Sequence, residues 1–239
     1  MVEMKSTLAA NALNLKFETE WIAKNIVKVS LNIDYSTKFR SNLMALGVSL
    51  PSNLHRAVQS RQCEFMAGRA CVQMAMCLLE ASNVELPQIG AHREPLWPEG
   101  YYGSISHSAT CAVAIVATDE KGYFGIDRQE WLPHEIARSI SPNVLCAKEY
   151  AFSTLFSNYA EFITTVFSAK ESLFKAMFPS IKIYVDFFVV QLCFVDWPQG
   201  RLIFEVTQDL SCAFYKGKKV EVFFRRFVDD VETRIIDCL

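Results

Sequence analysis

Three charged residues lie among aromatic residues in the segment VFSAKESLFKAMF (166–178), whose apolar spacing predicts a helix. Successive residues on a helix are turned by about 100°, which puts Glu171 roughly 40° from Phe167 and inside the aromatic stripe. Lys170 and Lys175 flank that stripe on its two sides. An ionised carboxylate within a buried stripe needs a charged partner or a metal ion, so Glu171 is a candidate functional residue.

The other side of this helix carries Ser168, Ser172 and Ala176. This arrangement is the reverse of that in a typical surface helix, whose charged residues lie opposite its apolar face. The plain structural alternative is an i,i+4 ion pair between Glu171 and Lys175 on a solvated rim, worth roughly a few tenths of a kcal/mol. That alternative accounts well for the two lysines and poorly for Glu171.

A second acidic residue, Asp127, follows an apolar run in YFGIDRQEW (123–131) and is expected near the end of a strand. Carboxylates from a strand end and a helix face can share a hard cation such as Mg²⁺. Two carboxylates are few for Ca²⁺, but they suit a Mg²⁺ ion that also binds the phosphates of a substrate. The alternative for Asp127 alone is a turn or capping residue.

The segment GSISHS (103–108) places His107 between small hydroxyl residues, where it could donate a hydrogen bond to an anion. The surrounding residues do not form the glycine pattern of a nucleophile elbow, so a Ser/His/Asp triad is not indicated. The candidate phosphate contacts among the arginines are Arg61, Arg69 and Arg93. For His107 and for each arginine, a structural or surface role is the alternative.

The elements that must position these residues follow a mixed order of helices and strands. A helix is predicted from Ser52 or Asn53 to about Ser82, and Gly68 within it either packs closely or admits a ligand. A proline-rich connection (83–100) precedes strands over 101–118 and 123–131. Further strands after the helix at 166–178 are predicted to be joined by turns at Pro198–Gly200 and at Lys216–Gly217.

Composition indicates a folded chain and excludes several classes of protein. The 239 residues are 51% hydrophobic and carry a net charge of −2, so a nucleic-acid binder held by bulk charge is not indicated. The eight cysteines lie mostly in apolar runs without metal-ligand spacing, which predicts reduced thiols and a cytosolic location. The N-terminal residues lack the pattern of a secretory signal, and no apolar run is long enough to predict a transmembrane segment.

Four segments together resemble the large, single-chain 4′-phosphopantetheinyl transferases, in the branch of enterobactin synthetase component D. They are RQCEFMAGRA (61–70), REPLWPEGYYGSISHS (93–108), FGID (124–127) and FSAKESLFKAMFP (167–179). They occur in the order of the family and cover roughly the middle half of the chain.

This resemblance implies an α+β fold of two similar halves in a pseudo-twofold arrangement, with the active site in the cleft between them. The halves are expected at 1–123, with the coenzyme A-binding elements, and at 124–239, with the metal-binding and catalytic elements. The implied reaction moves the 4′-phosphopantetheine arm of coenzyme A to a serine of an apo carrier protein, and adenosine 3′,5′-bisphosphate leaves.

The resemblance also implies roles for the candidate residues. Asp127 and Glu171 would hold Mg²⁺ against the pyrophosphate, and Glu171 would help to deprotonate the carrier serine. Lys175 would stabilise the phosphates and Lys170 would add a contact to coenzyme A. The remaining coenzyme A contacts implied by the family are Arg61, Arg69, Arg93, Ser106 and His107.

One position departs from the family pattern. Many members have an acid two residues after the first aspartate, where this chain has Gln129. A glutamine can offer a carbonyl oxygen to a metal but brings no charge, so metal affinity could fall or two carboxylates could suffice. Glu130 is a poor substitute, because adjacent side chains of a strand point to opposite faces.

Two other functions stay open at this stage. The first is a degenerate protein that binds coenzyme A or a carrier without transfer, and the second is a different Mg²⁺-dependent phosphotransferase or hydrolase. The chain has no P-loop motif, which disfavours the familiar nucleotide enzymes. The expected partners are coenzyme A and apo carrier proteins of nonribosomal peptide, polyketide or fatty-acid synthases, with siderophore synthesis fitting the branch, and a monomer is expected.

Overall fold

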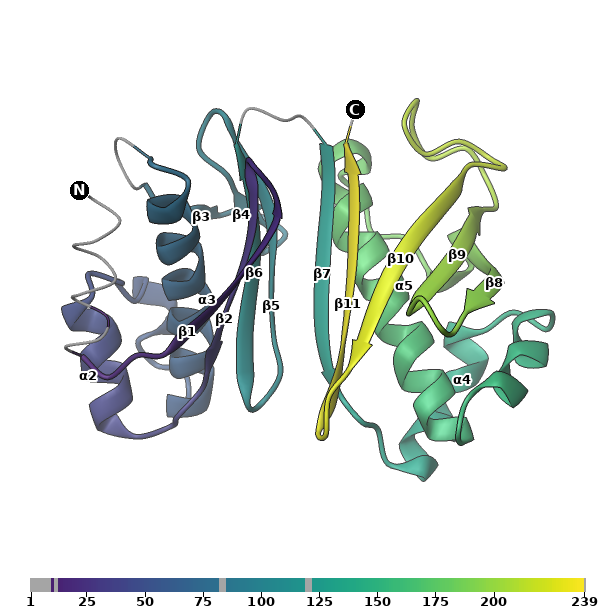
Figure 1. Cartoon of the computed structure of the whole chain (residues 1–239), viewed down its shortest axis with the longest axis horizontal. Coiled ribbons are helices and arrows are strands. Elements are labelled where there is room, and N and C mark those ends of the chain that lie inside the picture. Colours follow the sequence, from purple (N-terminus) through teal and green to yellow (C-terminus); the bar gives the residue numbers. More distant parts are fainter. Residues whose placement is uncertain (1–9, 11–12, 82–84, 119–121, 239) are drawn as a thin grey trace. The chain divides into compact units, whose positions relative to one another are not determined.

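The chain divides into two compact units, Met1–Lys121 and Gly122–Leu239, each with its own hydrophobic core. Figure 1 shows the computed structural model, which describes residues 10, 13–81, 85–118 and 122–238. The division falls close to the boundary predicted between residues 123 and 124. The roles predicted for the two halves, and the cleft between them, stay predictions.

The first unit is a four-stranded antiparallel sheet with a long helix, α3 (Gln59–Leu78), packed on β2 and β6. The strand order is β1-β2-β6-β5, and the register pairs His107 at the end of β5 with Ala112 of β6. The bounds of the four strands are Phe17–Ala23 for β1, Ile26–Asn32 for β2, Tyr101–His107 for β5 and Cys111–Thr118 for β6. The smaller elements are α2 (Thr37–Ala45), η1 (Ser52–Leu54), β3 (Gln88–Ile89) and β4 (Pro95–Leu96).

The start predicted for α3 is wrong. Ser52 begins the 3₁₀ turn η1, and α3 begins only at Gln59. The reason lies in the buried side chain of Gln62, whose Nε2 carries two hydrogen atoms and lies within hydrogen-bond distance of three carbonyl groups of the preceding segment. These acceptors are the carbonyls of Leu54, His55 and Ala57, at 3.1, 3.1 and 3.0 Å. The amide thereby stabilises a connecting turn where a continuous helix was expected.

Gly68 serves packing in this structure. A Cβ atom at Gly68 would lie 2.9 Å from Cγ2 of Ile105 on β5, so α3 and β5 approach more closely than an alanine would allow. This contact accounts for the glycine without a ligand.

The second unit is a five-stranded antiparallel sheet with the order β7-β11-β10-β9-β8. Its long helix, α5 (Tyr159–Ile181), packs on β7 and β11 (Figure 1). The strand bounds are Gly122–Glu130 for β7, Val190–Asp196 for β8, Arg201–Val206 for β9, Lys219–Arg226 for β10 and Asp230–Cys238 for β11. The other elements are α4 (His134–Val144), η2 (Glu149–Leu155) and η3 (Phe187–Val189).

The side of α5 that packs most deeply is the side with small residues. Ser168, Ser172 and Ala176 are fully buried, whereas Phe167 and Phe174 keep part of their surface exposed. A Cβ atom at Gly125 of β7 would lie 1.8 Å from the carbonyl oxygen of Ser172, so the helix backbone rests directly on the strand. The aromatic stripe is therefore not the most deeply buried face of α5, contrary to expectation.

The predicted turn at Pro198–Gly200 is confirmed, because it joins β8 to β9 and Gly200 has a φ of +59°. Lys216 and Gly217 lie instead near the end of a longer connection between β9 and β10. The turn itself is present, because the amide of Lys218 donates to the Tyr215 carbonyl at 3.0 Å and Gly217 has a φ of +88°. No strand forms over 207–218, so the strand predicted immediately before this turn is wrong.

The cysteines whose side chains are described are all free thiols, as predicted. Their burial is less uniform than expected, since Cys212 is exposed. Within the described ranges, no helix is both long and apolar enough to cross a lipid bilayer. The N-terminal segment discussed above for a secretory signal falls largely outside the described residues.

Candidate active site

The centre of the site is an ion pair between a strand and a helix of the second unit. Nζ of Lys175 on α5 donates to Oδ1 of Asp127 on β7 at 2.8 Å and to the carbonyl oxygen of Ile126 at 3.0 Å. Asp127 lies inside β7, which continues to Glu130, so it is neither at the strand end nor a capping residue. Lys175 lies one helical turn after Glu171 on α5. The ion pair therefore holds the carboxylate of Asp127 against the same part of the helix that carries Glu171.

The second oxygen of Asp127 is held by a buried hydroxyl network. Oγ of Ser168 donates to Oδ2 of Asp127 at 2.9 Å and lies 2.9 Å from Oγ1 of Thr233. Thr233 is the register partner of Asp127 on β11. Ser168 and Thr233 are fully buried and Asp127 is 7% exposed, so this network sets the orientation of the carboxylate with little competition from water.

Glu171 is partly buried beside Asp127. Burial raises the pKa of its carboxyl group, the negative charge of Asp127 raises it further, and the positive charge of Lys175 opposes this. Glu171 is half-buried, so it fits a fully solvated rim position poorly. Two carboxylates that repel each other in this way favour a cation that would neutralise their charge.

Gln129 lies two residues after Asp127 on β7, so its side chain is on the same face of the strand. Its Nε2 donates to the carbonyl oxygen of Glu130 at 3.2 Å, an arrangement that uses the amide nitrogen and not the amide oxygen. In the part of the chain that the structure describes, no three His, Cys, Asp or Glu side chains form a metal cluster. A cation here would draw on Asp127, Glu171 and neutral oxygen atoms.

Lys170 does not lie on the solvated rim that was the structural alternative for it. Its Nζ is fully buried and has three acceptors: Glu149 at 2.9 Å, the Val144 carbonyl at 2.8 Å and the Phe187 carbonyl at 3.2 Å. An ammonium group has three hydrogen atoms to donate, and three acceptors use them all. The structure therefore gives no support to the coenzyme A contact predicted for Lys170.

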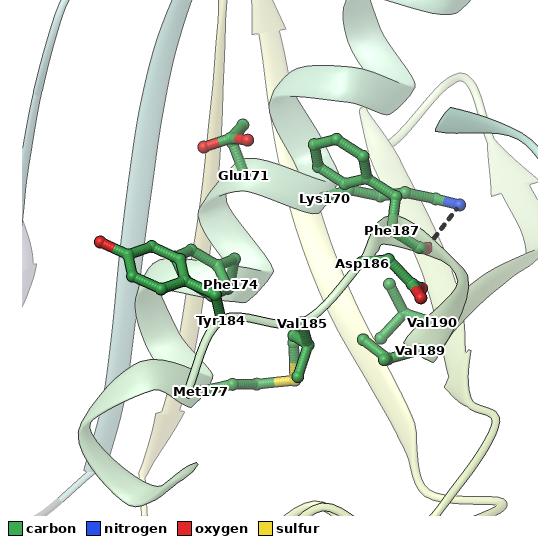
Figure 2. A pocket seen from close by; sticks show the side chains of 10 residues that line it. All are labelled: Lys170, Glu171, Phe174, Met177, Tyr184, Val185, Asp186, Phe187, Val189 and Val190. Atoms are coloured by element: carbon green, nitrogen blue, oxygen red, sulfur yellow. Dashed lines mark hydrogen bonds between the residues drawn. The ribbon is translucent and has the colours of Figure 1, made fainter. Parts of the chain in front are cut away.

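A pocket of about 230 Å³ opens beside Glu171 (Figure 2). Its walls come from α5, from the segment between α5 and β8, and from the first residue of β8. Apart from Glu171, Lys170 and Asp186, its lining is apolar or aromatic: Phe174, Met177, Tyr184, Val185, Phe187, Val189 and Val190. The pocket can therefore take an extended and mainly apolar group whose end reaches Glu171.

The first unit brings together two of the residues predicted to bind an anion. Nη1 of Arg61 on α3 lies 2.7 Å from Nε2 of His107 on β5. Because a guanidinium group only donates, this contact requires Nε2 of His107 to accept, which corresponds to the tautomer with its proton on Nδ1. Glu64 faces both residues, with Oε2 3.4 Å from Arg61 and 3.8 Å from Nδ1 of His107. Sequence reasoning missed Glu64, although its i,i+3 spacing from Arg61 was a signal.

Arg69 lies two turns along α3 from Arg61 and is 7% exposed. Its guanidinium group lies 5.1 Å from the ring centroid of Phe65, and burial lowers its pKa to about 10. Among the described residues, its buried Nη1 has no hydrogen-bond partner. A buried cation with an unused donor is suited to an anionic ligand.

The last two candidates differ in their setting. Ser106 is buried on β5 beside His107. Arg93 is exposed in the turn between β3 and β4, at a positive φ of 67°. Over the described ranges, no side-chain contact joins Arg93 to the cluster of Arg61 and His107, so the structure does not bring it into a common site.

The comparison with known proteins decides the family. The 4′-phosphopantetheinyl transferase N-terminal domain matches residues 50–117, and the 4′-phosphopantetheinyl transferase superfamily matches residues 123–233. Enterobactin synthase component D of Escherichia coli strain K12 is 30% identical over 169 residues, which cover 70% of this chain and 78% of that protein. The chain belongs to the 4′-phosphopantetheinyl transferases.

Two further relatives agree. Enterobactin synthase component D of Salmonella typhimurium is 34% identical over 124 residues, or 52% of this chain and 51% of that protein. The 4′-phosphopantetheinyl transferase PptT of Mycobacterium tuberculosis is 30% identical over 135 residues, which cover 55% of this chain and 58% of that protein. The predicted family, its branch, the α+β fold and the enzyme class are thus confirmed. This phosphopantetheinyl transferase uses coenzyme A as its substrate and carrier proteins as acceptors.

Proposed function

We propose that this transferase attaches the phosphopantetheine arm to a serine of an apo carrier protein in a Mg²⁺-dependent reaction and releases adenosine 3′,5′-bisphosphate. The observation that carries the proposal is the meeting of Asp127, Glu171 and Lys175 on one side of α5. It supplies two carboxylate ligands and one ammonium group beside a pocket, which suits a phosphoanhydride substrate.

The donor set fits a magnesium ion. Asp127 raises the pKa of Glu171, and Lys175 offsets only part of that repulsion, so a hard cation would be stabilised between the two carboxylates. Gln129 offers an amide oxygen on the same face as Asp127, and substrate phosphates and water would complete an octahedral shell. When bound, Mg²⁺ neutralises charge that develops on the pyrophosphate as it breaks.

The chain's own residues account for the remaining chemistry. The serine oxygen forms a bond to the β-phosphorus of coenzyme A, and the bond from that phosphorus to the bridging oxygen breaks. The bridging oxygen leaves with the adenosine 3′,5′-bisphosphate. The serine proton passes to Glu171, directly or through water, because a raised pKa makes its carboxylate a stronger base. Lys175 remains beside the phosphates as a fixed positive charge.

The nucleotide part of coenzyme A would bind the basic residues of the first unit. Arg69 has an unused buried donor, and Arg61 with His107 forms a second group of donors once the phosphate replaces their mutual contact. Ser106 beside His107 would add a hydroxyl, and Arg93 would add an exposed positive charge. These individual roles are the ones that the family resemblance implies, and Arg93 is the residue to which the structure adds least support.

The arm itself would enter the pocket beside Glu171. Pantetheine is an extended chain of methylene, methyl and amide groups, and the pocket is lined mainly by apolar and aromatic residues. Placing the arm there would put its phosphate end near Glu171 and Lys175.

The likeness to enterobactin synthase component D favours peptidyl or aryl carrier domains of siderophore synthesis as acceptors, ahead of polyketide or fatty-acid carriers. The free thiols favour a cytosolic location. One chain supplies every residue named above, which favours a monomer.

The first experiment measures the intact mass of several apo carrier proteins after incubation with this transferase, coenzyme A and Mg²⁺, with EDTA as a control. We expect each true acceptor to gain one phosphopantetheine group, to fail to do so in EDTA, and to fail with Glu171→Gln. Full activity of Glu171→Gln would show the assignment of Glu171 to be wrong. Binding of coenzyme A without any mass gain would favour the degenerate binding protein.

A further inference from the structure

The buried pair of Lys170 and Glu149 joins three separate segments of the second unit. Lys170 belongs to α5 and donates to the carbonyl oxygens of Val144 and Phe187 as well as to Glu149. Glu149 begins η2 and accepts from the backbone amides of two segments. Those donors are Cys146 N at 2.7 Å and Leu192 N at 2.6 Å. Both side chains have no exposed surface.

These contacts act directly on the wall of the pocket beside Glu171. Phe187, Val189 and Val190 line that wall, and Leu192 follows it on β8. Figure 2 shows the hydrogen bond from Lys170 to Phe187, with the amine pointing away from Glu171. The pair thus ties this wall to the helix that carries Glu171, at the residue next to Glu171.

Burying this ion pair has a large free-energy cost, so fold stability alone does not explain it well. Removing two charges from water costs several kcal/mol per ion, and well-packed apolar residues often replace such a pair without loss of stability. Every donor of Lys170 and both oxygens of Glu149 are nevertheless satisfied by named partners. A network this complete fixes one arrangement of its segments more sharply than apolar packing does.

We propose that Lys170 and Glu149 form a positioning pair for the transfer reaction. The pair fixes the pocket wall formed by Phe187, Val189 and Val190 against α5, and so sets where the pantetheine arm lies relative to Glu171. Neither residue touches the substrate. This inference rests on the proposed function, because it assumes that the arm occupies this pocket.

The test compares three variants of the full chain: Lys170→Met, Glu149→Gln and the double variant K170M/E149Q. Thermal unfolding is followed together with two substrate measurements. These are kcat/KM for coenzyme A in the carrier-mass assay and the inhibition constant of adenosine 3′,5′-bisphosphate. The bisphosphate lacks the arm, so its binding reports on the nucleotide contacts alone. Lys148→Met is the matched control, since it makes the same change at an exposed lysine next to Glu149.

Each single variant leaves one charge buried without its partner, so we expect its melting temperature to fall by on the order of 10 °C. The double variant removes both charges and should melt closer to the wild type. We expect its kcat/KM for coenzyme A to remain at least about tenfold low, because the Phe187 carbonyl has lost its donor, while bisphosphate binding stays within about twofold. Lys148→Met should match the wild type in every measurement.

Two results would overturn the proposal. If the double variant regains both its melting temperature and full turnover, the pair serves stability alone. If Glu149→Gln transfers normally while folded Lys170→Met does not, Lys170 acts on the substrate itself. Should the double variant fail to fold, Lys170→Arg gives the same comparison, since it keeps the charge and alters the geometry at Phe187. A wild-type chain that transfers nothing would instead count against the proposed function.

Discussion

The hydroxyl network behind Asp127 allows a sharp test of the site. Ser168→Ala removes the donor that lies 2.9 Å from Oδ2 of Asp127 and leaves every charged residue in place. A hydrogen bond to an ionised group contributes about 1.5–3 kcal/mol, and both partners here are buried, so solvent screening does not reduce this figure. A free-energy change of about 1.4 kcal/mol corresponds to a factor of ten in an affinity or a rate. We therefore expect Ser168→Ala to lose roughly 10- to 100-fold in Mg²⁺ affinity or activity. Losses of this size are typical when a residue that orients a metal ligand is removed.

The assay is transfer to an apo carrier, measured by intact mass over a titration of Mg²⁺. Ser172→Ala is the matched control, because Ser172 is an equally buried serine on α5 whose hydroxyl donates to the Ala169 carbonyl at 2.8 Å. We expect Ser172→Ala to keep the half-saturating Mg²⁺ concentration of the wild type. Wild-type behaviour of Ser168→Ala, or an equal loss in both variants, would refute the orienting role assigned to Ser168.

Four further predictions concern the same region. Gln129→Glu adds a carboxylate on the face of Asp127, so the half-saturating Mg²⁺ concentration should fall several-fold; no change in a Mg²⁺ titration would contradict the predicted ligand role of Gln129. Because the pKa of Glu171 is raised, its active anion is lost as pH falls through a range above the ordinary one for glutamate, and added Mg²⁺ should move this acid limb of kcat/KM to lower pH. The same raised pKa means that ionised Glu171 destabilises the fold above that range, so Glu171→Gln should abolish transfer yet raise the melting temperature at pH 8; a fall would contradict the burial argument. Gly125→Ala would place a Cβ atom 1.8 Å from the Ser172 carbonyl and should lower the melting temperature strongly, as thermal unfolding would show.

Local patterns were enough to single out three residues that the structure brings together. Helical spacing places Lys175 one turn after Glu171, and an apolar run ending in a single acid marks Asp127 as the carboxylate of a strand. The structure joins Asp127 to Lys175 at 2.8 Å and lets the charge of Asp127 act on Glu171. These residues were predictable because their chemistry is visible in short stretches of sequence.

The packing of α5 was not predictable in the same way. A hydrophobic stripe normally marks the buried face of a helix, and here that rule selects the wrong side. The decisive residue is Gly125, which lies outside the helix and allows the backbone at Ser172 to rest on β7. Such a contact depends on which strand the helix meets, and the helical periodicity carries no information about that partner.

The environment of Glu64 shows a similar limit. Its spacing from Arg61 on α3 is visible in the sequence, but its approach to His107 requires α3 and β5 to lie side by side. The tautomer of His107 then follows from the donor character of Arg61 alone. A histidine that looks like a free anion contact in the sequence is thus already engaged, and the phosphate binding proposed for it would have to replace that contact.

The three charges of the segment KESLFK serve two separate purposes because of where a helix points them. Adjacent residues are turned by about 100°, so Lys170 and Glu171 cannot share a partner even though they are neighbours in sequence. Lys170 is directed inward to Glu149, 21 residues away, while Glu171 faces Asp127, and Lys175 returns to that same side one turn later. The inward lysine needs a carboxylate from a segment that carries no motif of its own, which is why sequence reasoning assigned it to the substrate. The geometry instead makes Lys170 a link between α5, which carries Glu171, and the pocket wall at Phe187, which is the basis of the positioning role proposed above.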